Sequence, residues 1–506
     1  MKSSNELLQE FINADAVNDN IALSKAPSSI WDNKGKENVL RVFQVASQTV
    51  PAYKDFLKKN NIDSDKVRSL SDFQQLPLTD KENYLMKYPL NKLCINGDIS
   101  KAGVISSSSG STGKPFYWPR VLEQDLGIAK TLELLYVNNF SINSKSTLLL
   151  VCLGLGVWTA GEMMLSSGKM IAQKGHKFSV MCPGINLPET IKLLKNVAPL
   201  YEQTYITGYP AFVKDIIDMA IKERIDLEPL SLKVLVGGEV FTEEWREYIY
   251  ENAKMTNKYN DITSVLGSSE GGIVGVETPL CVFIRKKCFE SKTINISFFN
   301  SKNLPSVVQY NPGAKYFETV NESLVFTNLG GLPLIRYNTK DKGGLFSFDD
   351  VIKKLKANGI SADTIKNELG NISQWTFPFA YILGRGNLMA TIYAVNIYPE
   401  NIKPVLFDKE FKNFVTGRFA MRTSETDKER DQYLEIFIEL APKEESNNAL
   451  CSKLEISILN HIKEVNSEFN KLCSSINRQD LIKIRLKSFQ DKNYFSSDKQ
   501  KFVLLK

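Results

Sequence analysis

The sequence is poor in the residue types that most often bind zinc or form catalytic triads. Its 506 residues include only two histidines, His176 and His461, and seven cysteines with no C-x-x-C pair. Neither histidine lies near a cysteine or a matching carboxylate cluster, which disfavours zinc sites and histidine-based triads. An odd, irregular set of cysteines is also unlike the disulfide framework of a secreted protein. We therefore expect reduced thiols and a chemistry that uses other groups.

A strong charge excess and a long apolar run are also missing. The chain has 63 lysines and arginines against 57 aspartates and glutamates, a net charge of +6, which gives little reason to expect nucleic-acid binding. The apolar stretch at 148–158 is too short to cross a bilayer, and no apolar run follows the basic residue at the N-terminus. We expect a cytoplasmic protein whose partners include neither nucleic acid nor a membrane.

The sequence does contain enough apolar residues for a folded protein of more than one domain. Hydrophobic residues make up 43% and charged residues 24% of the chain, which is ordinary globular usage. Residues 1–100 have apolar residues at helical spacing and predict a helical N-terminal segment. From 104 to 345, short apolar runs such as 147–153 alternate with helical stretches such as 209–222. This alternation predicts an α/β fold, with a large N-terminal domain of mixed β-sheets and helices at 1–383.

The pattern changes after residue 384 to that of a small α+β domain at 384–506. Its expected elements are strands at 413–422, 433–440 and 481–486 and a helix at about 447–472. Before this boundary, residues 349–358 form a lysine-rich amphipathic stretch, and residues 359–378 predict a polar loop. Two domains is the simplest count.

A loop rich in hydroxyl groups follows the strand-like residues 103–105. It reads Ser106-Ser107-Ser108-Ser109-Gly110-Ser111-Thr112-Gly113-Lys114-Pro115. Glycines let backbone N–H groups turn toward an anion, hydroxyls add donors and lysine adds a positive charge, so we predict a phosphate-binding loop. A flexible linker is the alternative. A Walker-type loop is disfavoured, because Ser108 and Pro115 stand where that motif needs Gly and Ser or Thr.

Six ordered blocks resemble the adenylate-forming superfamily and, within it, the phenylacetate-CoA ligase family. The hydroxyl-rich loop resembles the family motif S-S-G-T-T-G-K-P, from which only Ser111 differs. The other blocks are 69–90, Val236-Gly237-Gly238-Glu239, Gly267-Ser268-Ser269-Glu270, Leu334-Ile335-Arg336-Tyr337-Asn338-Thr339-Lys340-Asp341, and Gly384-Arg385 with Val395-Asn396-Ile397-Tyr398-Pro399. The resemblance covers about residues 39 to 402 and the extreme C-terminus.

The resemblance implies an ATP site. Glu270 would bind Mg²⁺, which prefers carboxylate and phosphate oxygens, and Ser269 would contact the α-phosphate. Asp341 would accept hydrogen bonds from the ribose hydroxyls. The other residues expected to bind ATP or AMP are Ser108, Ser109, Gly110, Ser111, Thr112, Gly113, Lys114, Gly237, Gly238, Glu239, Arg336 and Arg385. For Glu270 and Asp341 the alternative is an ordinary surface carboxylate.

Two more groups of residues receive roles by resemblance. Residues 494–503 resemble the closing loop S-x-G-K-x-x-R-V, which implies that Lys499 is the catalytic lysine that bridges the attacking carboxylate and the α-phosphate. A solvated basic tail is the alternative. Residues 154–161 resemble the stretch Y-G-x-F-T-G-G of the acid pocket. The residues expected to bind the acid are Trp158, Gly208, Tyr209 and Gly267. A tryptophan in the core is an equally good interpretation of Trp158.

The chain departs from the family pattern at several positions. Leu266 stands where the family has an aromatic residue, and Gly386-Asn387 stands at the usually acidic hinge. Ala394 replaces a glycine beside the tunnel for the pantetheine thiol, and Asp498 replaces the glycine before the lysine. Leu266 bears on the acid pocket and Gly386-Asn387 on the hinge, whereas Ala394 and a longer segment between Asp341 and Gly384 bear on the second half-reaction.

The expected function is activation of a carboxylic acid by MgATP to an acyl-adenylate with release of pyrophosphate, followed by transfer to a thiol, first of all that of CoA. Transfer to a carrier-protein phosphopantetheine or to an amine is the first alternative. A non-catalytic nucleotide-binding homologue is the second. The sequence leaves the identity of the acid and the formation of a homodimer open.

Overall fold

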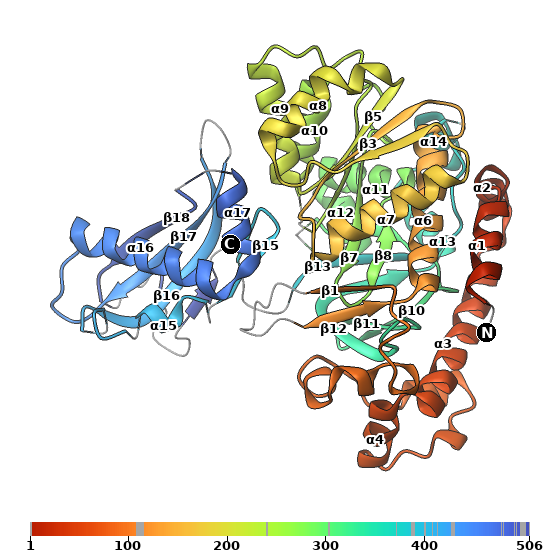
Figure 1. Cartoon of the computed structure of the whole chain (residues 1–506), viewed down its shortest axis with the longest axis horizontal. Helices are drawn as coiled ribbons and strands as arrows, with labels where there is room; N and C mark the ends of the chain where they lie inside the picture. Colours follow the sequence, from red (N-terminus) through yellow and green to blue (C-terminus); the bar gives the residue numbers. More distant parts are fainter. Residues whose placement is uncertain are drawn as a thin grey trace.

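The computed structural model describes residues 3–107, 116–238, 241–301, 304–370, 372–385, 390–398, 401–406, 408–411, 413–426, 431–476, 478, 480–489, 491, 493–495 and 502–504. Two parts lie side by side in Figure 1, a large part up to residue 385 and a smaller part from residue 390 onward, drawn in blue. The helical N-terminal segment that the sequence predicts is present. It consists of α1 (Ser4–Asn13), α2 (Ala16–Lys25), α3 (Ser29–Thr49), α4 (Pro51–Lys59) and α5 (Leu70–Gln74), with short 3-10 turns between residues 64 and 97.

One sheet runs through the large part, in the order β10-β11-β12-β13-β9-β8-β7-β6-β5-β3-β4. Its strands are β3 (Thr147–Cys152), β4 (Phe178–Met181), β5 (Gln203–Gly208), β6 (Lys233–Gly237), β7 (Ile262–Ser268), β8 (Gly272–Val276), β9 (Ser306–Gln309), β10 (Lys315–Val320), β11 (Ser323–Asn328), β12 (Leu334–Phe346) and β13 (Phe379–Arg385). The strands from β4 to β7 pair in parallel, and the others pair antiparallel. A separate hairpin joins β1 (Val104–Ser107) to β2 (Tyr117–Arg120).

Helices cover both faces of the parallel strands, as the continuous apolar run of β3 requires. Leu149 and Val151 point to a core shared with α6 (Leu122–Phe140) and α7 (Thr159–Gln173). Leu148 and Leu150 point to the opposite core, because successive side chains of a strand alternate between faces. The helices of that core are α8 (Leu187–Asn196), α9 (Pro210–Lys222) and α10 (Glu243–Asn252). The remaining helices of the large part are α11 (Pro279–Glu290), α12 (Lys292–Phe299), α13 (Phe348–Ala357) and α14 (Ala362–Leu369).

The parallel strands end at one edge of the sheet, and this edge positions the site. The register places Cys152 of β3 beside Gly208 of β5, and Gly237 of β6 beside Val265 of β7. The loops that follow these strands therefore lie next to one another, where α/β folds usually bind ligands.

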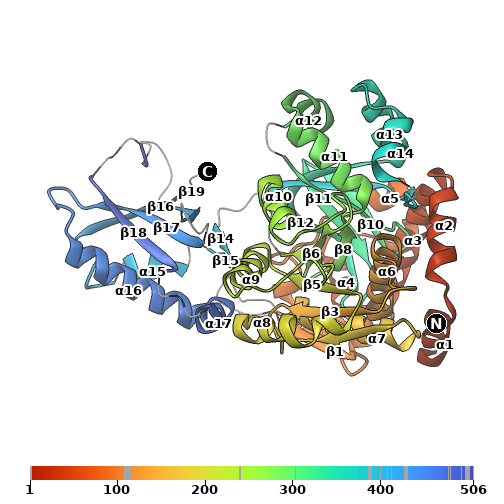
Figure 2. The ribbon, with the colours of Figure 1, turned by 90° about the horizontal axis from the view of Figure 1, so that it is seen from above.

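The small part has its own sheet, in the order β18-β17-β16-β19, and a short hairpin of β14 and β15. Its elements are β14 (Ala390–Ile392), β15 (Val395–Ile397), α15 (Lys403–Leu406), β16 (Val415–Glu425), β17 (Gln432–Leu440), α16 (Asn448–Val465), α17 (Ser467–Ile476), β18 (Ile482–Lys487) and β19 (Phe502–Leu504). A single core of buried residues from Ala390 to Ile484 holds these elements together. Seen from above, α17 lies beside α8 and α9 of the large part (Figure 2). The domain boundary at residue 384 stays a prediction.

Two expected elements of the sequence were wrong. The helix expected at 447–472 is two helices, because Asn466 leaves helical geometry and its side chain bonds to Asn396 O (3.1 Å) and caps α17 at Phe469 N (3.0 Å). The polar loop expected at 359–378 contains α14, which Ser361 caps through Thr364 N (3.1 Å).

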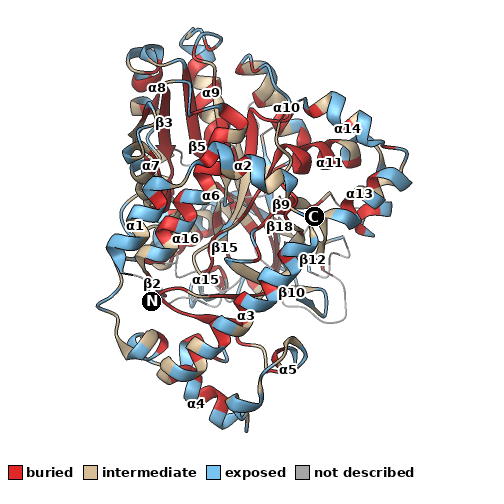
Figure 3. Cartoon of the chain, turned by 90° about the vertical axis from the view of Figure 1, so that its right-hand side faces the viewer, coloured by how far each residue is buried: buried red, intermediate tan, exposed pale blue. Residues whose placement is uncertain are grey.

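The surface follows the amphipathic pattern of the helices. The outer faces of α1, α2, α13 and α14 are largely exposed, whereas the strands beneath them are buried (Figure 3). Among the described residues, no helix is long and apolar enough to cross a membrane.

Candidate functional site

The loops after β5 and β6 meet each other and the small part. Gly238 has a φ of +82°, a conformation that favours glycine. A Cβ atom at this position would lie 3.0 Å from Cε1 of Tyr209 and 3.3 Å from Cβ of Ala394. Tyr209, which we expect at the acid, and Gly238, which we expect at the adenine, therefore lie beside Ala394, which departs from the family pattern.

The hairpin turn between β7 and β8 presents Ser269 and Glu270 at the same edge of the sheet. Gly267 pairs with Ile273, and the Ser268 hydroxyl accepts a hydrogen bond from Gly271 N (3.0 Å), which closes the turn. Glu270 is half-buried, and no described residue donates a hydrogen bond to its carboxylate or forms an ion pair with it. The carboxylate oxygens of Glu270 are therefore available for a ligand.

Trp158 lies between this turn and the strand that leads into the hydroxyl-rich loop. Ser107 N donates to Val157 O (2.8 Å), and Ser107 forms an isolated bridge with Trp158. The next residue, Thr159, has its Oγ1 atom 3.5 Å from Oγ of Ser269. The structure thus brings the expected acid-binding tryptophan and the Ser269–Glu270 turn together.

Several expected site residues fall outside the described residues. They are Ser108, Ser109, Gly110, Ser111, Thr112, Gly113, Lys114, Glu239 and Lys499, together with the side chain of Arg385. Their roles stay predictions.

An arginine that the sequence analysis did not single out fixes the strand before the hydroxyl-rich loop. Buried Arg120 pairs with Asp125 (2.8 Å) and Glu162 and donates to Oγ of Ser106 (3.2 Å). Burial raises the pKa of Asp125, although the nearby Arg120 opposes this shift. These bonds link β2 and β1 to α6 and α7. The sequence offers no signal for the cluster, because its carboxylates lie on two different helices.

Asp341 and Arg385 are neighbours on paired strands. The register of β12 and β13 places these two residues directly opposite each other. Asp341 is half-buried, and its backbone N–H donates to Oγ1 of Thr339 (3.1 Å). Two residues expected at the nucleotide therefore lie together where the large part ends.

Arg336 is buried and makes its polar contacts within the protein. Its guanidinium pairs with Glu318 (3.1 Å) and donates to the backbone oxygens of Gln74 (2.5 Å) and Leu76. These bonds hold the N-terminal segment against β12. The nucleotide-binding role of Arg336 stays a prediction, and its described contacts are structural.

The β7–β8 turn can supply one carboxylate ligand to Mg²⁺. Among the described residues, no group of three or more His, Cys, Asp or Glu side chains could hold a metal ion. Mg²⁺ is commonly held by one or two carboxylates together with substrate phosphates. Glu270, with no donor in the described structure, suits that arrangement.

The cysteines do not form part of this chemistry. All seven are free thiols. Burial raises the pKa of Cys152, at the end of β3, to about 12, and a protonated thiol is a poor nucleophile.

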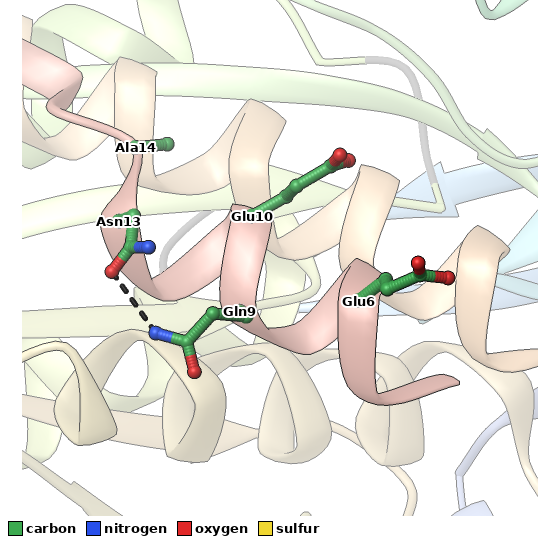
Figure 4. A pocket seen from close by; sticks show the side chains of 5 residues that line it. All are labelled: Glu6, Gln9, Glu10, Asn13 and Ala14. Carbon is green, nitrogen blue, oxygen red and sulfur yellow. Dashed lines mark hydrogen bonds between the residues drawn. The ribbon is translucent and has the colours of Figure 1, made fainter. Parts of the chain in front are cut away.

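A surface hollow of about 440 Å³ lies along α1, away from these loops. Its lining residues, Glu6, Gln9, Glu10, Asn13 and Ala14, all come from α1 or its C-cap, and Gln9 donates to Asn13 (3.1 Å; Figure 4). Groups from a single helix do not converge on a ligand, so we assign it no function.

Comparison with known proteins identifies the relatives of this chain. It is 23% identical to the phenylacetate-coenzyme A ligase of Thermus thermophilus over 384 residues, which cover 73% of this chain and 74% of the relative. It is also 23% identical to the phenylacetate-coenzyme A ligase of Aromatoleum evansii, over 74% of this chain and 76% of the relative. The chain therefore resembles phenylacetate-coenzyme A ligases in sequence. No protein-family model matches the sequence.

Solved structures share the fold of this chain. 2-Hydroxyisobutyryl-CoA ligase in complex with 2-HIB-AMP and CoA, in the thioesterification state, matches with a TM-score of 0.66 and 14% identity over 96% of this chain and 91% of that one. The same enzyme in the postadenylation state, with R3-HIB-AMP, matches with a TM-score of 0.54 and 14% identity, over 95% and 91% of the two chains. These comparisons confirm the expected family resemblance and the α/β fold class.

Proposed function

We propose that this phenylacetate-CoA ligase-like enzyme activates a carboxylic acid with ATP and transfers the acyl group to the thiol of CoA. In the first step, an oxygen of the acid attacks the α-phosphorus of ATP, which forms acyl-AMP and releases pyrophosphate. In the second, the CoA sulfur loses its proton and attacks the acyl carbon, and AMP leaves. Pairs of half-reactions of this kind need one site that binds nucleotide, acid and thiol in turn.

The observation that carries this proposal is the convergence of four loops at one sheet edge, those that follow β3, β5, β6 and β7. The turn with Glu270 lies beside Trp158, and Tyr209 lies beside Gly238 and Ala394. A carboxylate without a donor suits the Mg²⁺ that accompanies ATP phosphates, glycine-rich backbone suits a planar base, and two aromatic side chains suit an organic acid.

We assign the roles of the residues as follows. Glu270 would hold Mg²⁺, which neutralises charge on the ATP phosphates when bound. Gly237 and Gly238 would let the backbone approach the adenine, and Asp341 would accept hydrogen bonds from the ribose. Lys499 would stabilise the charge at the α-phosphate during the first step.

The sequence relatives and the arrangement of the two parts support CoA as the acceptor. Both relatives bear the name of a CoA ligase. The chain as a whole matches 2-hydroxyisobutyryl-CoA ligase better in its thioesterification state (TM-score 0.66) than in its postadenylation state (TM-score 0.54). We infer that the small part stands here in the orientation of the thiol-dependent step.

The first test is acid-dependent exchange of pyrophosphate into ATP, measured with a panel of aryl, fatty and amino acids. One acid class should support exchange, and addition of CoA should convert that acid to its thioester. Glu270→Gln should reduce exchange by at least about tenfold, since a neutral amide is a weaker ligand for a hard cation.

Lys499→Ala provides the control that separates binding from chemistry. It should lose exchange while ATP still protects the protein from thermal unfolding. No exchange with any acid, despite ATP binding by the unaltered chain, would favour a nucleotide-binding protein without turnover. Adenylation without any CoA thioester would favour a carrier protein or an amine as the acceptor.

A further inference from the structure

The loop between β3 and α7, which we call the acid loop, runs from Gly154 to Thr159 and contacts two neighbours within the large part. Ser107 N, at the end of β1, donates to the backbone oxygen of Val157 (2.8 Å). Oγ1 of Thr159 lies 3.5 Å from Oγ of Ser269, in the β7–β8 turn. The acid loop therefore joins the strand before the hydroxyl-rich loop to the turn that we expect to bind Mg²⁺.

The start of the acid loop is held by backbone and side-chain packing. A Cβ atom on Gly161, in the first turn of α7, would lie only 2.1 Å from the backbone oxygen of Gly154, so helix and loop are in close backbone contact. The side chain of Leu155 packs against the core shared with α6 and α7. The backbone oxygen of Leu155 is thus fixed in position by the residues on either side of it.

The small part reaches this oxygen. Lys471 on α17 donates from Nζ to the backbone oxygen of Leu155 (2.9 Å), 316 residues away in the sequence. Helix α17 lies on the side of the small part that faces the large part (Figures 1 and 2). Within the described part of the chain, no carboxylate forms an ion pair with Lys471. Burial lowers the pKa of the Lys471 amine, and an ammonium shielded from water is costly unless it finds a hydrogen-bond acceptor.

Close packing provides a second point of contact between the two parts. A Cβ atom on Gly238 would lie 3.3 Å from Cβ of Ala394, which connects β14 to β15 in the small part. Apolar packing has no preferred direction, whereas a hydrogen bond restricts both distance and angle. The Lys471 bond and the Ala394 contact come from different segments, and together they define how the small part is turned relative to the large part.

We propose that Lys471 is a positioning residue, which holds the small part on the acid loop in the orientation of the thiol-dependent step. It acts through the loop that carries Trp158 and not on the reacting atoms. Its role in the reaction rests on the proposed function. The docking of the small part is a property of the chain itself, and it can be measured without turnover.

Single-molecule energy transfer on the full-length chain tests this proposal, because it counts docked and undocked molecules separately. Labels are introduced as unnatural amino acids at two exposed positions. One is Lys145, in the turn before β3 and so at the opposite end of that strand from the acid loop, and the other is Ile456 on α16, which is 60% exposed.

Three substitutions at position 471 separate the hydrogen bond from the bulk of the side chain. Lys471→Met keeps a long side chain without the charged donor, and should lower the docking equilibrium by about tenfold. Lys471→Glu places a negative charge against the backbone oxygen and should lower it further. Lys471→Arg, which keeps a charged donor, should stay close to the unaltered chain. Equal docking in Lys471→Met and in the unaltered chain would overturn the proposal.

Lys453→Met is the matched control. Lys453 lies on α16 of the small part, is 65% exposed and pairs with Glu410 of the same part (3.1 Å). The substitution removes the same charge from the small part without touching the acid loop, so docking should not change. An equal loss of docking in Lys453→Met would also overturn the proposal, since net charge and not the bond to Leu155 would then control docking.

With an active acid in hand, thioester formation relative to pyrophosphate exchange should follow the measured share of docked molecules. Lys471→Met should lower this ratio, and Lys471→Arg should restore it. A higher KM for the acid with docking unchanged would overturn the proposal, because Lys471 would then only order the acid loop. Absence of any adenylation by the unaltered chain would instead count against the proposed function and leave the docking result standing.

Discussion

At the scale of single residues, the backbone conformation of Ala394 explains why the family has a glycine at this position. Its φ is +62°, in the left-handed region where a Cβ atom is strained. The family glycine at this position adopts such a conformation without that strain. The alanine therefore stores strain in the hairpin that contacts Gly238.

Ala394→Gly should stabilise the small part against unfolding by about 0.5 to 1 kcal/mol. The left-handed conformation costs a residue with a Cβ about 1–2 kcal/mol, and the greater freedom of glycine in the unfolded chain offsets about 0.4–1 kcal/mol of the gain. Urea unfolding of both forms measures the difference. The substitution should also raise thioester formation relative to pyrophosphate exchange. Equal ratios in the two proteins would contradict the idea that this methyl group narrows the path of the thiol.

Arg336 belongs to a motif shared with the family, but its contacts in this structure stabilise the fold. The motif suggests nucleotide binding, but its guanidinium lies among Glu318 and the backbone oxygens of Gln74 and Leu76. Only the tertiary structure identifies these partners, because Gln74 lies 262 residues away in the sequence.

At the scale of elements, the turn between β3 and α7 depends on a glycine in the first turn of the helix. A Cβ atom on Gly161 would lie 2.1 Å from the backbone oxygen of Gly154. Such a contact forces the backbone of the loop with Trp158 to move. Gly127, in α6, is exposed, and a Cβ there would meet nothing within 4 Å.

Alanine at these two helical glycines should therefore have opposite effects. Gly161→Ala should destabilise the protein by about 1–3 kcal/mol, as overpacked sites do, and weaken binding of the acid. Gly127→Ala should stabilise it by about 0.5–1 kcal/mol, because alanine suits a helix better than glycine. Thermal unfolding measures both, and the KM for the acid reports the loop. A stabilising effect of Gly161→Ala would show that the close approach to Gly154 is not maintained in solution.

At the scale of the whole molecule, the small part has a core of its own. Ile392, Leu434, Ile436, Leu454 and Ile458 are all fully buried and belong to one cluster. Burying an aliphatic side chain of this size contributes about 1.5–3 kcal/mol, so the cluster provides substantial stabilisation without the large part.

A fragment of residues 384–506 should therefore fold by itself, which also tests the predicted domain boundary. Its unfolding in urea should be a single cooperative transition seen by both near- and far-ultraviolet circular dichroism. Loss of the near-ultraviolet signal with retained helix would indicate a loosely packed state, and would mean that the small part needs α9 and its neighbours to complete its structure.

The sequence by itself determined the α/β architecture and the positions of its glycine-rich blocks, because both depend on local patterns. The apolar runs of β3, β5 and β6 and the amphipathic stretches between them predict an α/β sheet with helices on both faces. The glycine-rich blocks fall at strand ends, where backbone can approach a ligand. Periodicity and turn residues are readable without knowing what a segment packs against.

Only the tertiary structure decided the features that join distant segments. Asn466 ends one helix and begins the next through a bond to Asn396, and Tyr209, Gly238 and Ala394 meet from three separate loops. Lys471 of α17 reaches the backbone oxygen of Leu155 (2.9 Å), 316 residues away in the sequence. No local pattern specifies such contacts, because their energy depends on the burial and charge that a residue acquires from partners far away in the sequence.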